Sequence, residues 1–246
     1  MMQGVLSESN KTVSSFAYDQ IKNDIIFGRL RPGLKLKLEL MKNNYSVSVS
    51  ILRETLRRLA AEGFVAAHDQ RGFFVTPVSR QDLIEVADLR ILLECNALEA
   101  SIKSGDADWE GRVVAANHKL QKAERLMLAG DLSERERWKR SDWEFHAALI
   151  SSCSSTNLQQ IHSVIYDKYL RYQMLVLTFR GEMAVDEHKQ VFEAALDKDI
   201  KTATAILADH IQGGLSHTLS AVEWSDGEGL ELTAMATNQE LRDMMS

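Results

Sequence analysis

The sequence predicts a mainly α-helical protein of two unequal parts: a small N-terminal module of short helices with a β-hairpin, followed by an all-helical antiparallel bundle. Two observations support this division. Both prolines, Pro32 and Pro77, lie in the first third of the chain, so the rest contains no strong helix breaker. From Arg80 onward, apolar residues recur at helical spacing in segments separated mainly by glycines and serines.

Formal charge divides the chain at the same place. Residues 1–79 hold 11 Lys and Arg against 7 Asp and Glu, a balance of +4, whereas residues 80–246 hold 18 against 28, a balance of −10. An attraction to nucleic-acid phosphates therefore belongs to the first part alone, although the whole chain carries −6. The expected regions are a flexible N-terminus (1–13), the N-terminal module (14–79), the helical domain (80–221) and a C-terminal tail (222–246).

The composition also indicates a cellular compartment. No apolar run is long enough to cross a membrane, and the N-terminus lacks the charged-then-apolar pattern of a signal segment. Cys95 and Cys153 are isolated from each other, which argues against a disulfide framework. We therefore expect a protein of the reducing cytoplasm with no membrane partner.

The N-terminal module begins with a helix that Ser14 or Ser15 can cap and that ends at Gly28. The Arg-Pro-Gly sequence at 31–33 indicates a turn. The alternating leucines of residues 34–38 then predict a short strand.

The next elements complete a recognisable order. Residues 39–44 fit a short helix, and the serine-rich residues 46–48 form the turn after it. A further helix, with leucines on one side and arginines on the other, ends at Gly63. Strands at 65–68 and 72–75 flank a tight turn. Helix, turn, basic helix and hairpin in this order indicate a winged helix-turn-helix, which places one helix in a DNA groove.

The basic helix carries the chemistry that DNA recognition needs. Ser48 and Ser50 can donate hydrogen bonds to phosphate oxygens at its N-terminus, where the backbone amides also favour anions. Arg53 lies where a guanidinium can donate two hydrogen bonds to guanine O6 and N7. Arg57 and Arg58 can hold the phosphate backbone.

Basic residues outside this helix extend the surface that is expected to bind DNA. Arg71, before Gly72 at the hairpin tip, can enter the minor groove or contact phosphate. Lys35, Lys37 and Lys42 add a basic approach surface. The alternative is a solvated amphipathic helix with surface arginines, which would explain the helix taken alone. The preceding turn, the following hairpin and the local charge excess favour DNA binding.

Residues 25–78 resemble the DNA-binding domain of the GntR family of bacterial transcription regulators. The matching segments are GRLRPG (28–33), LKL (34–36), LRETLRRL (52–59), EGFV (62–65) and RGFFV (71–75). The resemblance implies a sequence-specific regulator of transcription that binds double-stranded operator DNA. The contacts that it implies are Ser48, Ser50, Arg53, Arg71 and Gly72.

The chain departs from the family pattern at two positions. Val49 stands where the family usually carries a second base-reading arginine, and Ile51 stands where proline is common. One expected base contact is therefore missing, and we expect an unusual operator or mode of base reading. Val49 is still placed to touch a thymine methyl group.

A second group of residues suggests a metal site. Asp142 and His146 are four apart, which puts both on one face of a helix. His188 lies near the start of a later helix and His210 lies on the last one. One carboxylate and three imidazoles from three helices can enclose a divalent metal. The alternative, that each histidine is an ordinary hydrogen-bonded or exposed residue, stays open on these residues alone.

Residues 80–221 resemble the all-helical ligand-binding domain of the FadR branch of the GntR family, so the bundle is expected to be FCD-like. The overall pattern most resembles regulators of the carbon-starvation-induced type. The resemblance implies that the one aspartate and three histidines bind the metal, with zinc or nickel favoured and manganese a third candidate. It also places Arg90, four residues before Glu94, where it can bind a carboxylate effector. The alternative for Arg90 is a surface ion pair with Glu94.

The leading hypothesis is a homodimeric transcription regulator, expected to be a repressor and not an enzyme. Its two winged domains would bind a pseudo-palindromic operator under the control of a small carboxylate bound beside the metal. One alternative is a metal-dependent hydrolase whose N-terminal module serves for docking. It lacks a general base, because Glu144 is two residues from Asp142 and points elsewhere on that helix. A third alternative is a structural metal without an effector.

Overall fold

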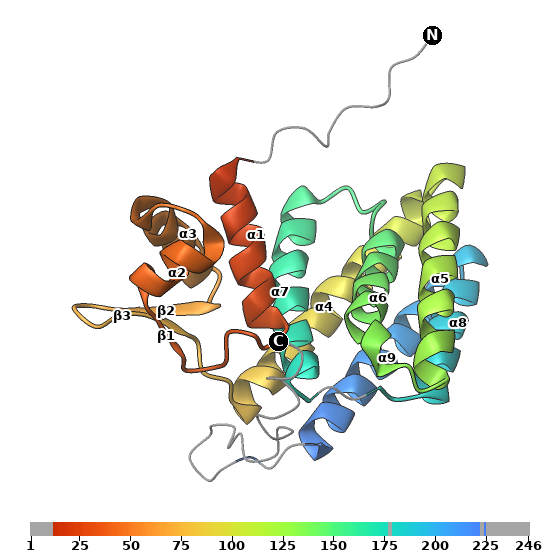
Figure 1. Ribbon diagram of the computed structural model, residues 1–246. Coiled ribbons are helices and arrows are strands. Elements are labelled where there is room, and N and C mark those ends of the chain that lie inside the picture. Colours follow the sequence, from red (N-terminus) through yellow and green to blue (C-terminus); the bar gives the residue numbers. More distant parts are fainter. Residues whose placement is uncertain (1–11, 177–178, 222–223, 225–246) are drawn as a thin grey trace. The chain divides into compact units, whose positions relative to one another are not determined.

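The computed structural model describes residues 12–176, 179–221 and 224 (Figure 1). The expected flexible N-terminus and C-terminal tail lie almost entirely outside these described residues. The chain divides into two compact units, Met1–Val78 and Ser79–Ser246. It is mainly helical, as the sequence predicts. Among the helices of the described ranges, none is both long and apolar enough to cross a membrane.

The first unit is the predicted winged helix-turn-helix. Its elements are α1 (Val13–Ile26), β1 (Lys35–Leu36), α2 (Leu38–Tyr45), α3 (Val49–Ala61), β2 (Val65–His68) and β3 (Gly72–Val75). The strands form one antiparallel sheet in the order β1-β3-β2, in which Val65 lies opposite Val75. The β2-β3 hairpin has the predicted bounds. Strand β1 is shorter than predicted because Leu38 already begins α2.

Helix α1 begins earlier than predicted. Thr12, rather than Ser14 or Ser15, caps it, and the Thr12 hydroxyl oxygen accepts a hydrogen bond from the backbone N–H of Ser15 at 3.2 Å. Several neighbouring hydroxyl residues can cap a helix equally well, so composition alone could not identify the first turn.

The core of the first unit forms where α1 and α3 pack together. Leu52, Leu56 and Leu59 of α3 are fully buried, as are Ile21 and Ile25 of α1. The apolar side of α3 therefore faces inward, and its arginine side is turned to solvent.

We expect Leu56→Ala to lower the free energy of unfolding of the first unit by about 2–5 kcal/mol, because it removes a fully buried side chain and leaves a cavity. Urea denaturation followed by circular dichroism would measure the loss. Arg57→Ala, an exposed change on the same helix, is the control and should shift stability by less than about 0.5 kcal/mol. Equal losses for the two variants would contradict the assigned packing.

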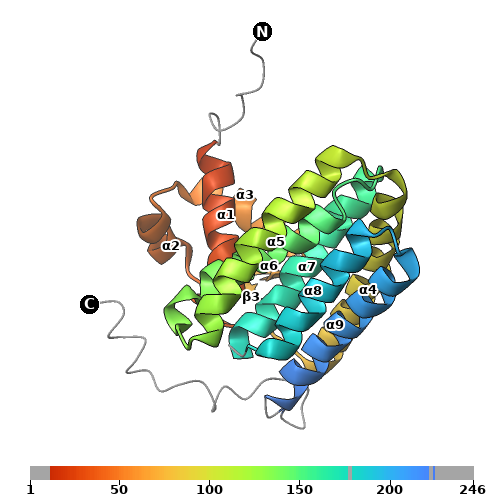
Figure 2. The same cartoon turned by 90° about the vertical axis from the view of Figure 1, so that its right-hand side faces the viewer.

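The second unit is the predicted helical bundle, with six α-helices within its described residues (Figure 2). They are α4 (Arg80–Ser104), α5 (Ala107–Leu128), α6 (Arg135–Leu149), α7 (Thr156–Val176), α8 (Glu182–Leu196) and α9 (Ile200–Ser220). A short 3-10 helix over Leu132–Glu134 directly precedes α6. Side chains of Ser79, Asp106 and Asp199 cap α4, α5 and α9 by accepting backbone N–H groups.

Candidate functional site

Helix α3 and its N-cap residue expose half of the eight predicted DNA contacts: Ser48, Ser50, Arg53 and Arg57. Ser48 caps the helix, and its hydroxyl oxygen accepts a hydrogen bond from the backbone N–H of Ile51 at 3.3 Å. Arg53 and Arg57 are exposed one turn apart, and neither side chain has a polar partner among the described residues. Both guanidinium groups are therefore available to an outside partner. The exposed members of the predicted set are Lys42, Ser48, Ser50, Arg53, Arg57, Arg71 and Gly72, and Val49 is half-buried.

Arg58, which we expected to hold the DNA backbone, is engaged within the first unit. Its guanidinium carbon lies 3.6 Å from the centroid of the Tyr18 ring, and its Nε lies 3.7 Å from a Glu62 oxygen. The Tyr18 hydroxyl donates a hydrogen bond to Glu62 at 2.6 Å. Arg58 thus joins α3 to α1, a contact between distant segments that the local helical pattern does not contain.

The hairpin tip holds Arg71 in an exposed position. Gln70 and Gly72 on either side have φ angles of 61° and 92°. The value at position 72 suits glycine, because other residues rarely adopt it without strain. The backbone N–H of Arg71 donates to the carbonyl of His68 at 3.2 Å, which closes the turn. The resulting turn presents the Arg71 side chain to solvent.

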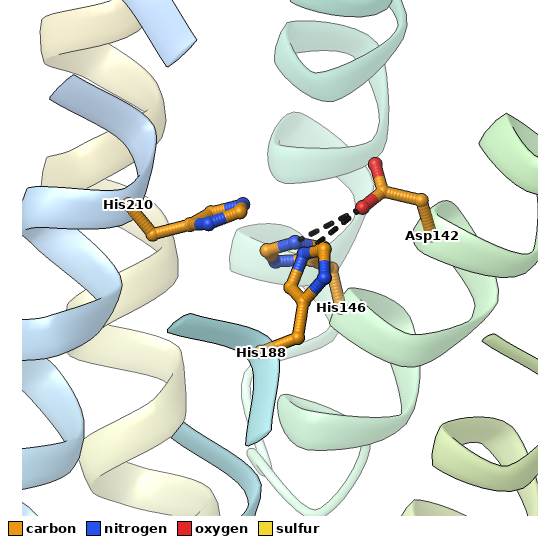
Figure 3. A group of neighbouring side chains, drawn as sticks. All are labelled: Asp142, His146, His188 and His210. Atoms are coloured by element: carbon orange, nitrogen blue, oxygen red, sulfur yellow. Dashed lines mark ion pairs between the residues drawn. The ribbon is translucent and has the colours of Figure 1, made fainter. Parts of the chain in front are cut away.

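In the second unit, the structure brings all four predicted metal ligands together. Asp142 and His146 come from α6, His188 from α8 and His210 from α9, and all four are buried (Figure 3). Each offers one ligand atom, and these atoms lie within 4.8 Å of one another. Asp142 Oδ1 lies 3.2 Å from His188 Nε2 and 3.8 Å from His146 Nε2.

Two nitrogen atoms in this cluster make no well-aligned hydrogen bond. The Nε2 atoms of His146 and His188 are buried, and among the described residues their polar contact is the ion pair that each forms with Asp142 Oδ1. A buried nitrogen without a well-aligned hydrogen bond destabilises the fold, and a metal ion between the two rings and Asp142 would satisfy both lone pairs at once. The side chains present therefore fit a divalent metal with nitrogen and oxygen ligands.

Charges around the cluster shift its titration. Burial by itself would raise the pKa of Asp142, but Lys139 and the neighbouring histidines hold that pKa well below its usual value. Burial would lower the pKa of His188, but Asp142 and Glu124 outweigh it and raise the pKa to about 9. Burial and the proximity of His188 lower the pKa of His210. The site therefore keeps a negative oxygen beside the imidazoles, as a metal cation requires.

A polar cavity adjoins the cluster. It is lined by Arg90, Lys139 and Arg180 together with His188 and His210, and its free space is about 20 Å³. That volume suffices for one small ion or water molecule. The cavity therefore combines ligand atoms with three cationic side chains.

Arg90 is buried beside this cavity and is 2% exposed. Its Nε donates to Glu94 at 2.9 Å, and its guanidinium carbon lies 4.3 Å from the Tyr166 ring centroid and 4.9 Å from that of Tyr169. The predicted Arg90–Glu94 pair exists, but it is buried and not on the surface.

Several residues of the site were not predicted. Glu124, Glu187, Lys139, Arg180 and Tyr166 surround the ligands. Of these, Glu187 had a visible signal, because it directly precedes His188. Glu144 lies outside the site, as predicted, and accepts a hydrogen bond from Lys119 at 2.8 Å.

Both units match known protein families. Residues 13–75 match the family described as "Bacterial regulatory proteins, gntR family", and residues 85–213 match the "FCD domain". An "Uncharacterized HTH-type transcriptional regulator BphR" from Paraburkholderia xenovorans (strain LB400) is 36% identical over 81% of this chain and 82% of its own length. The "HTH-type transcriptional repressor GlaR" from Escherichia coli (strain K12) is 32% identical over 81% of this chain and 93% of its own length.

Solved structures share the fold. The structure titled "E. coli McbR/YncC" superposes with a TM-score of 0.74 at 17% identity, over 86% of this chain and 99% of that one. A putative transcriptional regulator GntR from Rhodococcus sp. RHA1 gives a TM-score of 0.69 at 20% identity, over 85% and 99% of the two chains.

The fold, the exposed basic helix and these relatives define a DNA-binding transcription regulator with a helical ligand-binding unit. Within that class, the chain belongs to the GntR family of bacterial transcription regulators and carries an FCD domain. The family and its relatives are regulators and not enzymes, so the hydrolase alternative is not supported.

Proposed function

We propose that this regulator is a homodimeric repressor whose operator binding is controlled by a small carboxylate bound beside a divalent metal. The convergence of the two buried Nε2 atoms on Asp142 Oδ1, without a well-aligned hydrogen bond, carries the metal assignment. Three nitrogen ligands and one oxygen ligand favour zinc or nickel, with manganese the third candidate. The ion would supply a positive centre to which an effector oxygen binds.

The charges of the cavity favour an anionic effector. Four carboxylates and three cations surround the cluster: Asp142, Glu94, Glu124, Glu187, Arg90, Lys139 and Arg180. Taken as ionised, they sum to −1, so a divalent ion would bring the site to +1. A carboxylate would neutralise that charge, and Arg90 is placed to pair with it.

The lining of the cavity suggests how binding is transmitted. A carboxylate bound there would contact side chains from α4, α6, α8 and α9. A ligand that binds one arrangement of these helices more tightly than another shifts the population toward it.

Other features support the remaining parts of the proposal. Leu89 and Leu92 on α4 are 45% and 66% exposed, and Ile161 on α7 is 54% exposed, which suits burial against a second copy. GlaR, a relative at 32% identity, is named a repressor. Free thiols at Cys95 and Cys153 agree with the cytoplasm. The proposed DNA contacts are Lys42, Ser48, Val49, Ser50, Arg53, Arg57, Arg71 and Gly72.

We expect the matching member of a panel of small carboxylates to raise the thermal midpoint of the zinc-loaded protein. At a concentration of 100 times its Kd, a ligand adds about 2.7 kcal/mol of stability. A chelator should remove this carboxylate effect, because the ligand binds the ion as well as the protein.

The outcomes of this thermal-shift experiment separate the alternatives. Zinc stabilisation without any carboxylate response would indicate a structural metal. Carboxylate stabilisation that survives chelation would contradict a site shared between metal and effector.

A further inference from the structure

In each of the three cluster histidines, the ring nitrogen Nδ1 contacts a glutamate. His188 Nδ1 lies 2.6 Å from a Glu124 oxygen, and His210 Nδ1 lies 2.7 Å from a Glu187 oxygen. His146 Nδ1 makes the same kind of contact with Glu94. The arrangement therefore repeats three times around one centre.

The choice of nitrogen matters chemically. A neutral imidazole has one N–H group and one lone pair. A carboxylate on Nδ1 keeps the proton there, which leaves the lone pair of Nε2 for a metal and fixes the orientation of the ring. The Nε2 atoms of His146 and His188 are the ones that face Asp142 Oδ1, and they make no well-aligned hydrogen bond among the described residues. The glutamates and the open coordination positions are thus on opposite sides of these rings.

Two of the three glutamates are themselves held by arginines. Glu94 accepts a hydrogen bond from Arg90 Nε at 2.9 Å, and Glu187 accepts one from Arg180 at 2.5 Å. Each comes from a different helix from its histidine: Glu94 belongs to α4, Glu124 to α5 and Glu187 to α8. Such fixed partners reduce the freedom that the imidazoles would lose on binding an ion.

We propose that Glu94, Glu124 and Glu187 are positioning residues of the metal centre, which hold the three histidines in the tautomer and orientation that bind the ion through Nε2. This inference rests on the proposed metal site. It adds three carboxylates, none of them a ligand, that set metal affinity.

The most informative variants are at Glu187, which is partly exposed and can be changed without creating a buried hole. We expect Glu187→Ala to weaken Zn²⁺ binding about 10- to 100-fold, measured by competition with a chromophoric chelator. Glu187→Gln should lose less affinity, because an amide oxygen still accepts the Nδ1–H of His210. Glu124→Ala should behave as Glu187→Ala does, through His188. Glu144→Ala, on α6 but bonded only to Lys119 among the described residues, is the matched control and should leave Zn²⁺ affinity unchanged.

A spectroscopic measurement separates positioning from a general loss of structure. In the zinc-loaded protein, the Nδ1–H proton of His210 should give a strongly downfield NMR resonance that disappears in Glu187→Ala, while the other cluster histidines keep theirs. Unchanged Zn²⁺ affinity in both alanine variants would overturn the inference and leave the metal site standing. A wild-type chain that binds no Zn²⁺ would overturn the metal site and the inference together.

Discussion

Arg53→Ala is expected to abolish specific operator binding. Arg53 is exposed on α3 and has no polar partner among the described residues, so its guanidinium is free to bind guanine. Loss of one bidentate base contact costs about 1–3 kcal/mol of discrimination at each half-site of a dimer's operator. A gel-shift titration at fixed salt, with operator and scrambled DNA side by side, would measure the loss.

Arg57→Ala is the control for this prediction. Arg57 is proposed to contact phosphate, so Arg57→Ala should weaken binding to operator and scrambled DNA equally. It should also reduce the slope of log affinity against log salt concentration by about one. Operator affinity that is unchanged in Arg53→Ala would refute the assignment of α3 as the recognition helix. Equal losses on both DNAs would make Arg53 a backbone contact.

His188→Ala is expected to have the second largest effect, on metal content. In the proposed centre His188 supplies one of four ligand atoms, and its Nε2 faces Asp142 at 3.2 Å. Loss of a residue that only supports a ligand lowers metal affinity by up to about 100-fold. Loss of the ligand His188 itself should lower Zn²⁺ affinity by more than that. Elemental analysis after dialysis would show the protein largely free of metal, and the carboxylate-dependent thermal shift should fall with it.

His118→Ala is the matched control, because His118 is exposed on α5 and is not one of the cluster residues. It should retain full metal content. Full occupancy in His188→Ala would count against the proposed centre, whereas metal loss in both variants would point to a general weakening of the bundle.

Local patterns predicted most of the fold. Helical periodicity predicted the all-helical bundle from residue 80 onward, because the apolar positions of its helices face one shared core. Tight turn signals placed the β2-β3 hairpin at its observed bounds. The start of α1 was missed because Thr12, Ser14 and Ser15 are all competent caps, and the short strand before α2 was overextended because alternating leucines also suit the start of a helix.

The candidate site was only partly predictable for a different reason. The sequence spacing of four between Asp142 and His146 predicts that both lie on one face of a helix. Glu124 carries no such signal, because a single acid on an amphipathic helix is usually solvated; only the packing of α5 against α8 brings it to His188. The contact between Arg58 and the Tyr18 ring likewise could not be predicted from the sequence, because the two residues lie on different helices.

The distribution of the proposed metal centre over the bundle has a consequence for cooperativity. Each of the helices α4 to α9 contributes to the proposed centre or its supports: Glu94 from α4, Glu124 from α5, Asp142 and His146 from α6, Tyr166 from α7, His188 and Glu187 from α8, and His210 from α9. A helix that detaches in a local opening therefore strips the ion of a ligand or of its support. Ion binding would then raise the free energy of every partial opening together, so that hydrogen exchange in the loaded bundle would occur only through unfolding of the unit as a whole.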